Sequence, residues 1–101
     1  MDEKKIVKWS RDASSHFSSI LEYLFEQSPS AADIVGNAIS DEIEKLRLRS
    51  LALAPDRFKK NNDTGKYKAS IVYSYRISYY VSEDEIVILR IRHTSREPLD
   101  Y

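Results

Sequence analysis

Several residue types that support particular chemistries are absent or scarce in this chain. It has no cysteine, which excludes disulfide bonds, thiolate zinc sites and thiol nucleophiles, and which is compatible with a reducing cytoplasm. Its two glycines allow neither a GxGxxG turn nor a P-loop. None of its serines lies in a GxSxG motif. The sequence therefore carries no recognised motif for a nucleotide, a cofactor or a serine nucleophile.

Histidine is almost as scarce. His16 and His93 are the only two, and neither an HExxH motif nor an acidic calcium loop accompanies them. His16 lies beside Phe17 in a helical pattern, where a boundary position is a better interpretation than a metal ligand. We expect neither a metal ion nor a cofactor.

Long apolar runs and net charge are missing as well. No run approaches the ~20 apolar residues that span a bilayer, and no apolar h-region of a secretory signal follows the charged residues 2–5. Lys+Arg and Asp+Glu both count 16, so the chain has no overall attraction to nucleic acid. We expect a soluble cytoplasmic protein without a membrane partner.

What is present fits one small globular domain spanning residues 1–101. The hydrophobic fraction is 42% and the charged fraction 32%, which is typical of a folded chain with a single core. Charge is unevenly placed, because Asp41, Glu42 and Glu44 make the middle acidic while basic residues follow Ala54. A local charged patch can therefore exist on a neutral protein.

The first half of the chain predicts a short strand and two helices. Residues 4–10 favour a strand, and apolar residues then recur at helical spacing until Pro29. A second apolar stripe follows, and Pro55 marks its end. So few residues separate the helices that they should form an antiparallel hairpin. The predicted buried positions are Ala13, Phe17, Ile20, Leu21, Leu24 and Phe25, then Ala32, Val35, Ala38, Ile39, Ile43 and Leu46.

The start of the second helix has two interpretations. Ser30 with Asp33 three residues later matches a capping box in its weaker Asp form. Ser28 as the N-cap, with Pro29 at the first helical position, fits equally well.

The second half predicts three strands, at residues 67–73, 75–81 and 85–93, with turns at Ser74 and at residues 82–85. Together with the first strand they give the order β-α-α-β-β-β. The predicted fold is α+β, with the helical hairpin packed on one face of a mostly antiparallel four-stranded sheet.

Strict alternation assigns the strand residues to the two sheet faces. The core-facing set is Tyr73, Tyr75, Ile77, Tyr79, Val81, Val87, Leu89, Ile91 and His93. The opposite set is Arg76, Ser78, Tyr80, Ile88, Arg90 and Arg92. We expect Trp9, on the first strand, to pack in the core.

Basic and aromatic residues form the candidate binding set. Its members are Lys59, Lys60, Arg76, Tyr80, Arg90, Arg92, His93 and Arg96. Arginine can hold a phosphodiester in a bidentate manner, tyrosine can stack on bases, and histidine can transfer a proton. Two other interpretations remain open. In the first, exposed strands carry basic residues to discourage edge pairing, and these residues pair with Glu83, Asp84, Glu85 or Glu97. In the second, the arginines bind an acidic or amphipathic protein partner.

The closing residues also carry a resemblance. Residues 73–98 (YSYRISYYVSEDEIVILRIRHTSREP) resemble the C-terminal signature of the RelE/ParE toxin superfamily, in which a YRI-x-Y strand, an acidic turn, a VILRI-x-H strand and an R-x-P-like ending recur. Residues 7–33 resemble that family's opening strand and first helix, and residues 38–55 its second helix. The ordered set covers nearly the whole chain.

The resemblance implies a toxin of a type II toxin–antitoxin pair, neutralised by a cognate antitoxin. ParE-like members inhibit DNA gyrase, whereas RelE-like members are endoribonucleases that cut mRNA on the ribosome. Thr94 stands where some of those nucleases have tyrosine, and residues 22–33 and the HTSREP ending with Arg96 and Pro98 are more similar to the ParE side. The resemblance therefore favours a gyrase inhibitor, with the ribonuclease, or an inactive antitoxin-binding relative, as alternatives.

Roles for individual residues depend on the branch. In a nuclease, the resemblance implies Arg76 at the scissile phosphate, His93 in proton transfer, and Lys59, Lys60, Arg90 and Arg92 as RNA contacts. In a gyrase inhibitor, the same surface and the tail from Thr94 would contact protein. Strand alternation separates Arg76 from His93, which counts against a shared catalytic site.

Overall fold

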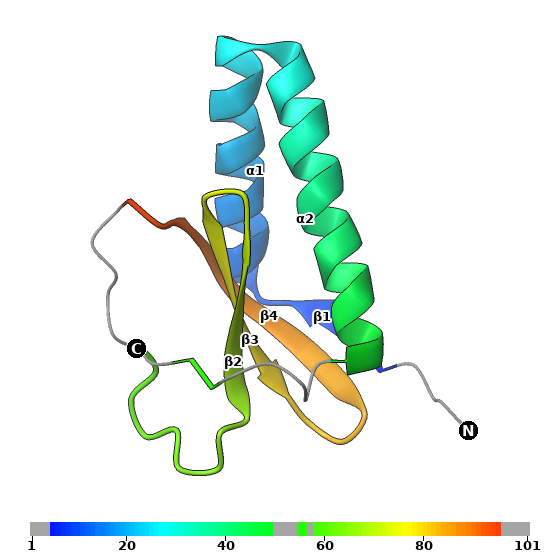
Figure 1. Ribbon diagram of the computed structural model, residues 1–101, viewed down its shortest axis with the longest axis vertical. Coiled ribbons are helices and arrows are strands. Elements are labelled where there is room, and N and C mark those ends of the chain that lie inside the picture. Colours follow the sequence, from blue (N-terminus) through cyan, green and yellow to red (C-terminus); the bar gives the residue numbers. More distant parts are fainter. Residues whose placement is uncertain (1–4, 50–54, 57, 96–101) are drawn as a thin grey trace.

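The computed structural model describes residues 5–49, 55–56 and 58–95. The elements follow one another as β1 (Ile6–Trp9), α1 (Arg11–Gln27), α2 (Pro29–Arg49), β2 (Tyr67–Val72), β3 (Tyr75–Val81) and β4 (Glu85–His93). The strands form one mixed sheet in the order β1-β4-β3-β2, in which β1 is parallel to β4 and the other neighbours are antiparallel. The helices form an antiparallel hairpin over one sheet face (Figure 1). The predicted α+β fold is confirmed.

No described helix is long and apolar enough to cross a membrane.

Two serines define the helix ends. The Ser10 hydroxyl accepts the Ala13 N–H at 3.0 Å and thus caps the N-terminus of α1. Ser28 closes α1 by donating its N–H to the Leu24 carbonyl at 2.8 Å, and its hydroxyl accepts the Ala31 N–H at 3.4 Å. Pro29 is the first residue of α2. The Ser28–Pro29 interpretation is therefore confirmed over the one that starts at Ser30, and a single residue joins the helices.

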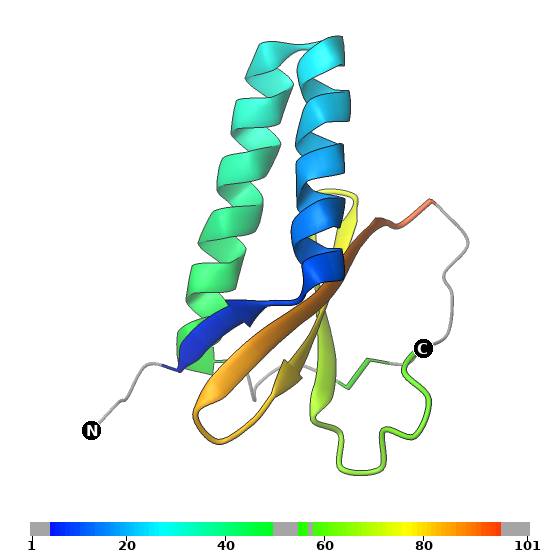
Figure 2. The ribbon, with the colours of Figure 1, turned by 180° about the vertical axis from the view of Figure 1, so that it is seen from behind.

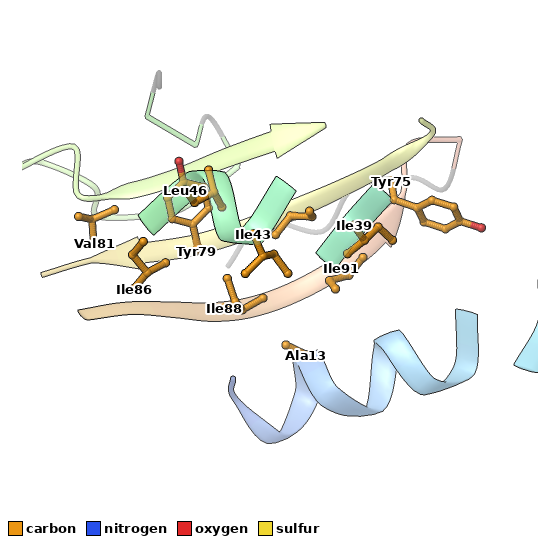
Figure 3. Packing of buried hydrophobic residues seen from close by; sticks show 11 residues of the cluster. Ala13, Ile39, Ile43, Leu46, Tyr75, Tyr79, Val81, Ile86, Ile88 and Ile91 are labelled. Carbon is orange, nitrogen blue, oxygen red and sulfur yellow. The ribbon is translucent and has the colours of Figure 1, made fainter. Parts of the chain in front are cut away.

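The core lies between the hairpin and the sheet (Figure 3). It is aliphatic apart from two tyrosines, and Val7, Trp9, Phe17, Ile20, Val35 and Val72 pack around it. The ring of Trp9 lies 5.3 Å from that of Phe17, which confirms the predicted packing role of Trp9. The buried cluster consists of Ala13, Ile39, Ile43, Leu46, Tyr75, Ile77, Tyr79, Val81, Ile86, Ile88 and Ile91.

Phe25 was predicted to be buried and Tyr73 to pack in the core or at its rim, but both are exposed. Phe25 is 61% exposed because it lies at the end of α1, beyond the sheet. Tyr73 is 64% exposed and has a positive φ of 52° in the β2–β3 turn, so the strand pattern ends one residue earlier than predicted. In both cases the apolar pattern of the sequence continues beyond the point where the helix and the sheet face each other.

A β-bulge in β4 changes which of its residues face the core. Ser78 pairs with Arg90 but Tyr79 pairs with Ile88, so Leu89 is an extra residue on β4. One inserted residue reverses the alternation of side chains. Ile86 and Ile88 are fully buried before the bulge, and Ile91 is buried after it. The prediction that Val87 and Leu89 face the core, with Ile88 opposite, is therefore wrong.

Helix α1 replaces β1 along the edge of β4. Beyond Trp9 the chain donates the Ser10 N–H to the Ile88 carbonyl at 2.9 Å, and the Ser10 hydroxyl bonds the Leu89 carbonyl at 2.8 Å. Six residues further on, Nδ1 of His16 accepts the Ile91 N–H at 3.3 Å. These side chains satisfy backbone groups of β4 that lack a strand partner.

His16 gives the fold a defined pH dependence. Desolvation by burial lowers its pKa from the usual 6.5; Asp12 opposes this, and the nearby charges of Arg92 and Arg90 add to it. The unfolded chain therefore takes up this proton at a higher pH than the folded chain. The contribution of His16 to the free energy of unfolding is complete above pH 6.5 and is lost as the pH falls through the lowered folded pKa.

We predict that His16→Asn removes this part of the pH dependence, because the Asn carbonyl can accept the Ile91 N–H but cannot be protonated. His16→Ala should lower the stability by about 1 kcal/mol near pH 7, because it leaves a partly buried N–H without its acceptor, and this difference should shrink as the pH falls. Urea unfolding between about pH 5 and pH 7 measures both effects. An unchanged pH slope in His16→Asn would contradict the assignment.

Candidate functional site

Three arginines lie on the sheet face that points away from the helices. Arg76 on β3 is directly opposite Arg92 on β4, and the next pair on this face is Ser78 with Arg90. Their neighbours Ile77 and Tyr79 are buried on the helix side, which fixes the orientation of the strand. The structure thus brings Arg76, Arg90 and Arg92 to one face, as the alternation predicted.

Arg76 is held by residues of the loop that precedes β2. Its Nη2 lies 2.8 Å from Oδ1 of Asp56, whose side chain is fully buried, while the Arg76 side chain is 16% exposed. The guanidinium also lies over the Phe58 ring, with its Cζ 4.6 Å from the ring centre. Arg76 is therefore enclosed by a carboxylate and an aromatic ring, and does not extend freely into solvent.

Asp56 itself is anchored by the backbone. Its Oδ1 accepts the Phe58 N–H at 3.0 Å, and its own N–H bonds the Tyr67 carbonyl at 2.7 Å. Pro55 forms an isolated bridge to Lys68 beside it. The start of the loop is thus fastened to β2, and the Asp56–Arg76 ion pair ties it to β3.

The arginine face retains unused hydrogen-bonding capacity. Nε of Arg76, Oγ of Ser78 and Nε of Arg92 are buried and have no hydrogen-bond partner among the described residues. Among the described residues, Asp56 forms an ion pair with Arg76, and no acid forms one with Arg92. A face with a surplus of positive charge and unused polar atoms suits an acidic or otherwise polar ligand.

Aromatic rings extend this face toward the other end of β3. Tyr80 is opposite Tyr67, and their rings lie 4.8 Å apart at 54°. Nζ of Lys59 lies 4.5 Å from the centre of the Tyr67 ring and also bonds the Lys60 carbonyl at 3.0 Å. Lys59 and Tyr80 are therefore part of one contiguous cluster, while Lys60 is exposed beside it.

His93 lies on the helix side of the sheet. It is opposite Tyr75, and the two rings meet edge to face at 5.2 Å. Its Nδ1 accepts the Ser95 N–H at 3.0 Å and lies 2.7 Å from the Ser95 hydroxyl. The bulge therefore does not turn His93 toward Arg76. The two residues predicted to act together in a nuclease are on opposite faces.

A groove of about 540 Å³ separates α1 from the ends of β3 and β4. His16 and His93 both line it, as do Tyr23 and Arg92. Within the described residues, no group of three His, Cys, Asp or Glu side chains could hold a metal ion. Arg96 lies outside the described residues, and its predicted role stays a prediction.

Asp56 and Phe58 are the site residues that the sequence analysis missed. A local signal existed, because Asp after Pro55 is a turn former whose side chain bonds the N–H two residues on. Its partner Arg76 is 20 residues away, and no periodic pattern links the loop to β3. The ion pair could not have been identified without the fold.

Comparison with known proteins places this geometry in a family. The family model described as ParE toxin of type II toxin-antitoxin system, parDE, matches residues 7–98. A solved structure of the chromosomal ParDE system from P. aeruginosa is similar, with a TM-score of 0.72 and 20% identity over 91% of this chain and 98% of that one. A structure of the toxin–antitoxin complex RelBE2 from Mycobacterium tuberculosis has a TM-score of 0.57 and 18% identity over 90% and 99%. No curated protein matched significantly.

The family match and the shared fold define the class, which is the toxin component of a type II toxin–antitoxin system in the RelE/ParE group. Within that group the chain belongs to the ParE toxin family, whose model covers nearly all of it. The resemblance in the sequence is confirmed, including its closer relation to the ParE branch. The family model describes the toxin of a type II toxin-antitoxin system, which supports a cognate antitoxin as a partner.

The Asp56–Arg76 pair can be tested by its effect on stability. Asp56→Asn keeps the acceptor for the Phe58 N–H but removes the charge, and we expect it to lower the free energy of unfolding by about 3 kcal/mol. Asp56→Ala loses both contacts and should cost more. As a control, Lys8→Ala breaks the exposed pair with Glu85 and should cost less than about 1 kcal/mol. Denaturant unfolding that finds Asp56→Asn as stable as the unchanged protein would contradict the role of the pair.

Proposed function

We propose that this toxin arrests growth by inhibiting DNA gyrase and that a cognate antitoxin neutralises it. The observation that carries the proposal is the match of residues 7–98 to the ParE toxin family, because the resemblance implies gyrase inhibition for the ParE branch. The arginine face, which we define as Arg76, Arg90 and Arg92 around Ser78, is the proposed contact surface, with Lys59, Lys60 and Tyr80 beside it. Arg96, which lies outside the described residues, is proposed as a further contact.

The arrangement of Arg76 and His93 supports gyrase over mRNA as the target. A general acid or base must reach the group that it serves through a hydrogen bond or one water molecule. Arg76 is on the face opposite to His93 and is already paired with Asp56. A phosphate held by Arg76 would therefore be separated from the His93 imidazole by the sheet itself.

Ribosome-dependent mRNA cleavage is the second candidate, and a specific observation favours it. Three arginines share one sheet face, and the neighbouring rings of Tyr67 and Tyr80 adjoin them. Positive charge next to aromatic surface is what single-stranded RNA binding requires. In that case the proton-transfer group would have to lie on the arginine face, and His93 would not supply it.

Two assays on the purified chain separate these functions. We predict inhibition of gyrase-catalysed DNA supercoiling and no ribosome-dependent mRNA cleavage. Arg92→Ala should weaken gyrase inhibition about tenfold, which is the effect of losing one energetically important interface residue. His93→Ala, on the other face of the same strand pair, should change it less than about twofold.

The opposite results are equally informative. Cleavage of mRNA without an effect on gyrase would overturn the proposal in favour of the ribonuclease. Inactivity in both assays, with intact binding of the antitoxin, would instead identify an inactive antitoxin-binding relative. Circular dichroism of each variant checks that a lost activity does not reflect a lost fold.

A further inference from the structure

The chain is neutral overall but strongly divided in charge. Between Asp12 and Glu44 the sequence has seven carboxylates and neither lysine nor arginine. Because the total is zero, the rest of the chain carries an equal excess of positive charge. These residues make up most of the helical hairpin, so the hairpin is acidic and the remainder of the molecule is basic. An acidic surface attracts cationic groups and repels nucleic acid.

The end of this hairpin projects away from the sheet. Figures 1 and 2 show that the distal turns of α1 and α2 lie side by side and extend beyond the strands. A groove of about 490 Å³ runs along this end. Leu21, Phe25 and Ala32 form its apolar lining. Glu22, Glu26 and Asp33 form an acidic rim on the same groove.

The groove contains an exposed aromatic side chain and carboxylates that do not contribute to the stability of the fold. Phe25 is 61% exposed and lies outside the core cluster, so its burial on binding would be favourable. Glu22 and Glu26 are spaced i and i+4 on one helix face, where like charges repel. No cation forms an ion pair with Glu22, Glu26 or Asp33 within residues 5–49, 55–56 and 58–95.

The groove is also firmly built. A Cβ placed on Gly36 would lie 3.0 Å from Cδ2 of Leu21, so the two helices touch beside the groove. Ala32, which lines it, is 8% exposed. Close contact between the two helices holds the backbone beside the groove in place before binding, which reduces the entropy lost on association.

We propose that the hairpin end is a docking site for a basic amphipathic helix of a protein partner. The apolar side of that helix covers Phe25 and Leu21, and its lysine or arginine side chains reach the carboxylates of the rim. This is the helix-in-groove mode of recognition, in which apolar anchors supply affinity and charge selects the partner. The site is distinct from the arginine face, and it does not depend on whether gyrase or mRNA is the target.

The test uses the full chain, labelled with ¹⁵N, and a helical probe peptide of about 18 residues built from leucine and lysine only. At about 0.15 M salt, we expect the peptide to shift amide signals of residues 21–34 while those of β2 and β3 stay in place. A peptide of the same pattern with glutamate in place of lysine should not bind. Phe25→Ser, which removes the anchor but no charge, should weaken binding about tenfold.

A matched pair of variants tests the role of the rim. Glu26→Lys should weaken peptide binding about tenfold, whereas Asp41→Lys, which makes the same charge change on the same hairpin outside the groove, should alter it less than about twofold. Equal effects of the two variants would mean that the peptide binds by non-specific charge attraction, and would overturn the proposal.

Peptide binding centred on the sheet, or no peptide binding at all, would also overturn the proposal. Sedimentation that shows Phe25-dependent self-association would also overturn it, in favour of a second copy of this chain.

Discussion

The β-bulge at Leu89 is the constraint on which the two faces of this protein depend. It lets Ile86 and Ile88 enter the core from the first half of β4 and Ile91 from the second half. Without it, the strand could not present isoleucine to the helices at both ends and arginine to the opposite face. The same inserted residue leaves His93 on the helix side, against Tyr75, while Arg90 and Arg92 join Arg76. Packing of the core thus decides which chemical groups can meet.

Negative and positive charge are separated between the helical hairpin and the opposite face of the sheet. The helical hairpin contains a long segment without lysine or arginine, and the sheet face opposite to it presents three arginines. One of these, Arg76, is neutralised internally by Asp56 and packed on Phe58. A neutral protein can therefore offer two unlike surfaces, and a toxin for which we propose both a target and an antitoxin has use for more than one.

Much of the fold could be predicted because local signals and packing agree. The helix stripes, Pro29, and the alternation in β3 gave the element order and the hairpin. The sequence does not show whether Ser28 or Ser30 caps the N-terminus of α2, because both match capping patterns. Only the backbone geometry distinguishes them. Phe25 and Tyr73 were assigned to the core because periodicity shows which side of an element is apolar but not where the opposing layer stops.

The site was harder to predict than the fold. Strict alternation placed Arg76, Arg90 and Arg92 together correctly, although it assigned Ile88 to the wrong face, because a bulge of one residue is invisible in a run of aliphatic residues. Asp56 was missed because its partner is distant in sequence, and the edge role of His16 was missed because it depends on where β1 ends. Each of these contacts joins segments that no local pattern connects.

The central claim is that His93 and Arg76 lie on opposite faces of one sheet. Nuclear Overhauser contacts of the His93 imidazole protons test it directly. The account predicts contacts with the ring protons of Tyr75, whose ring centre lies 5.2 Å away. Contacts of His93 with Phe58 or with the Arg76 side chain, and none with Tyr75, would contradict it.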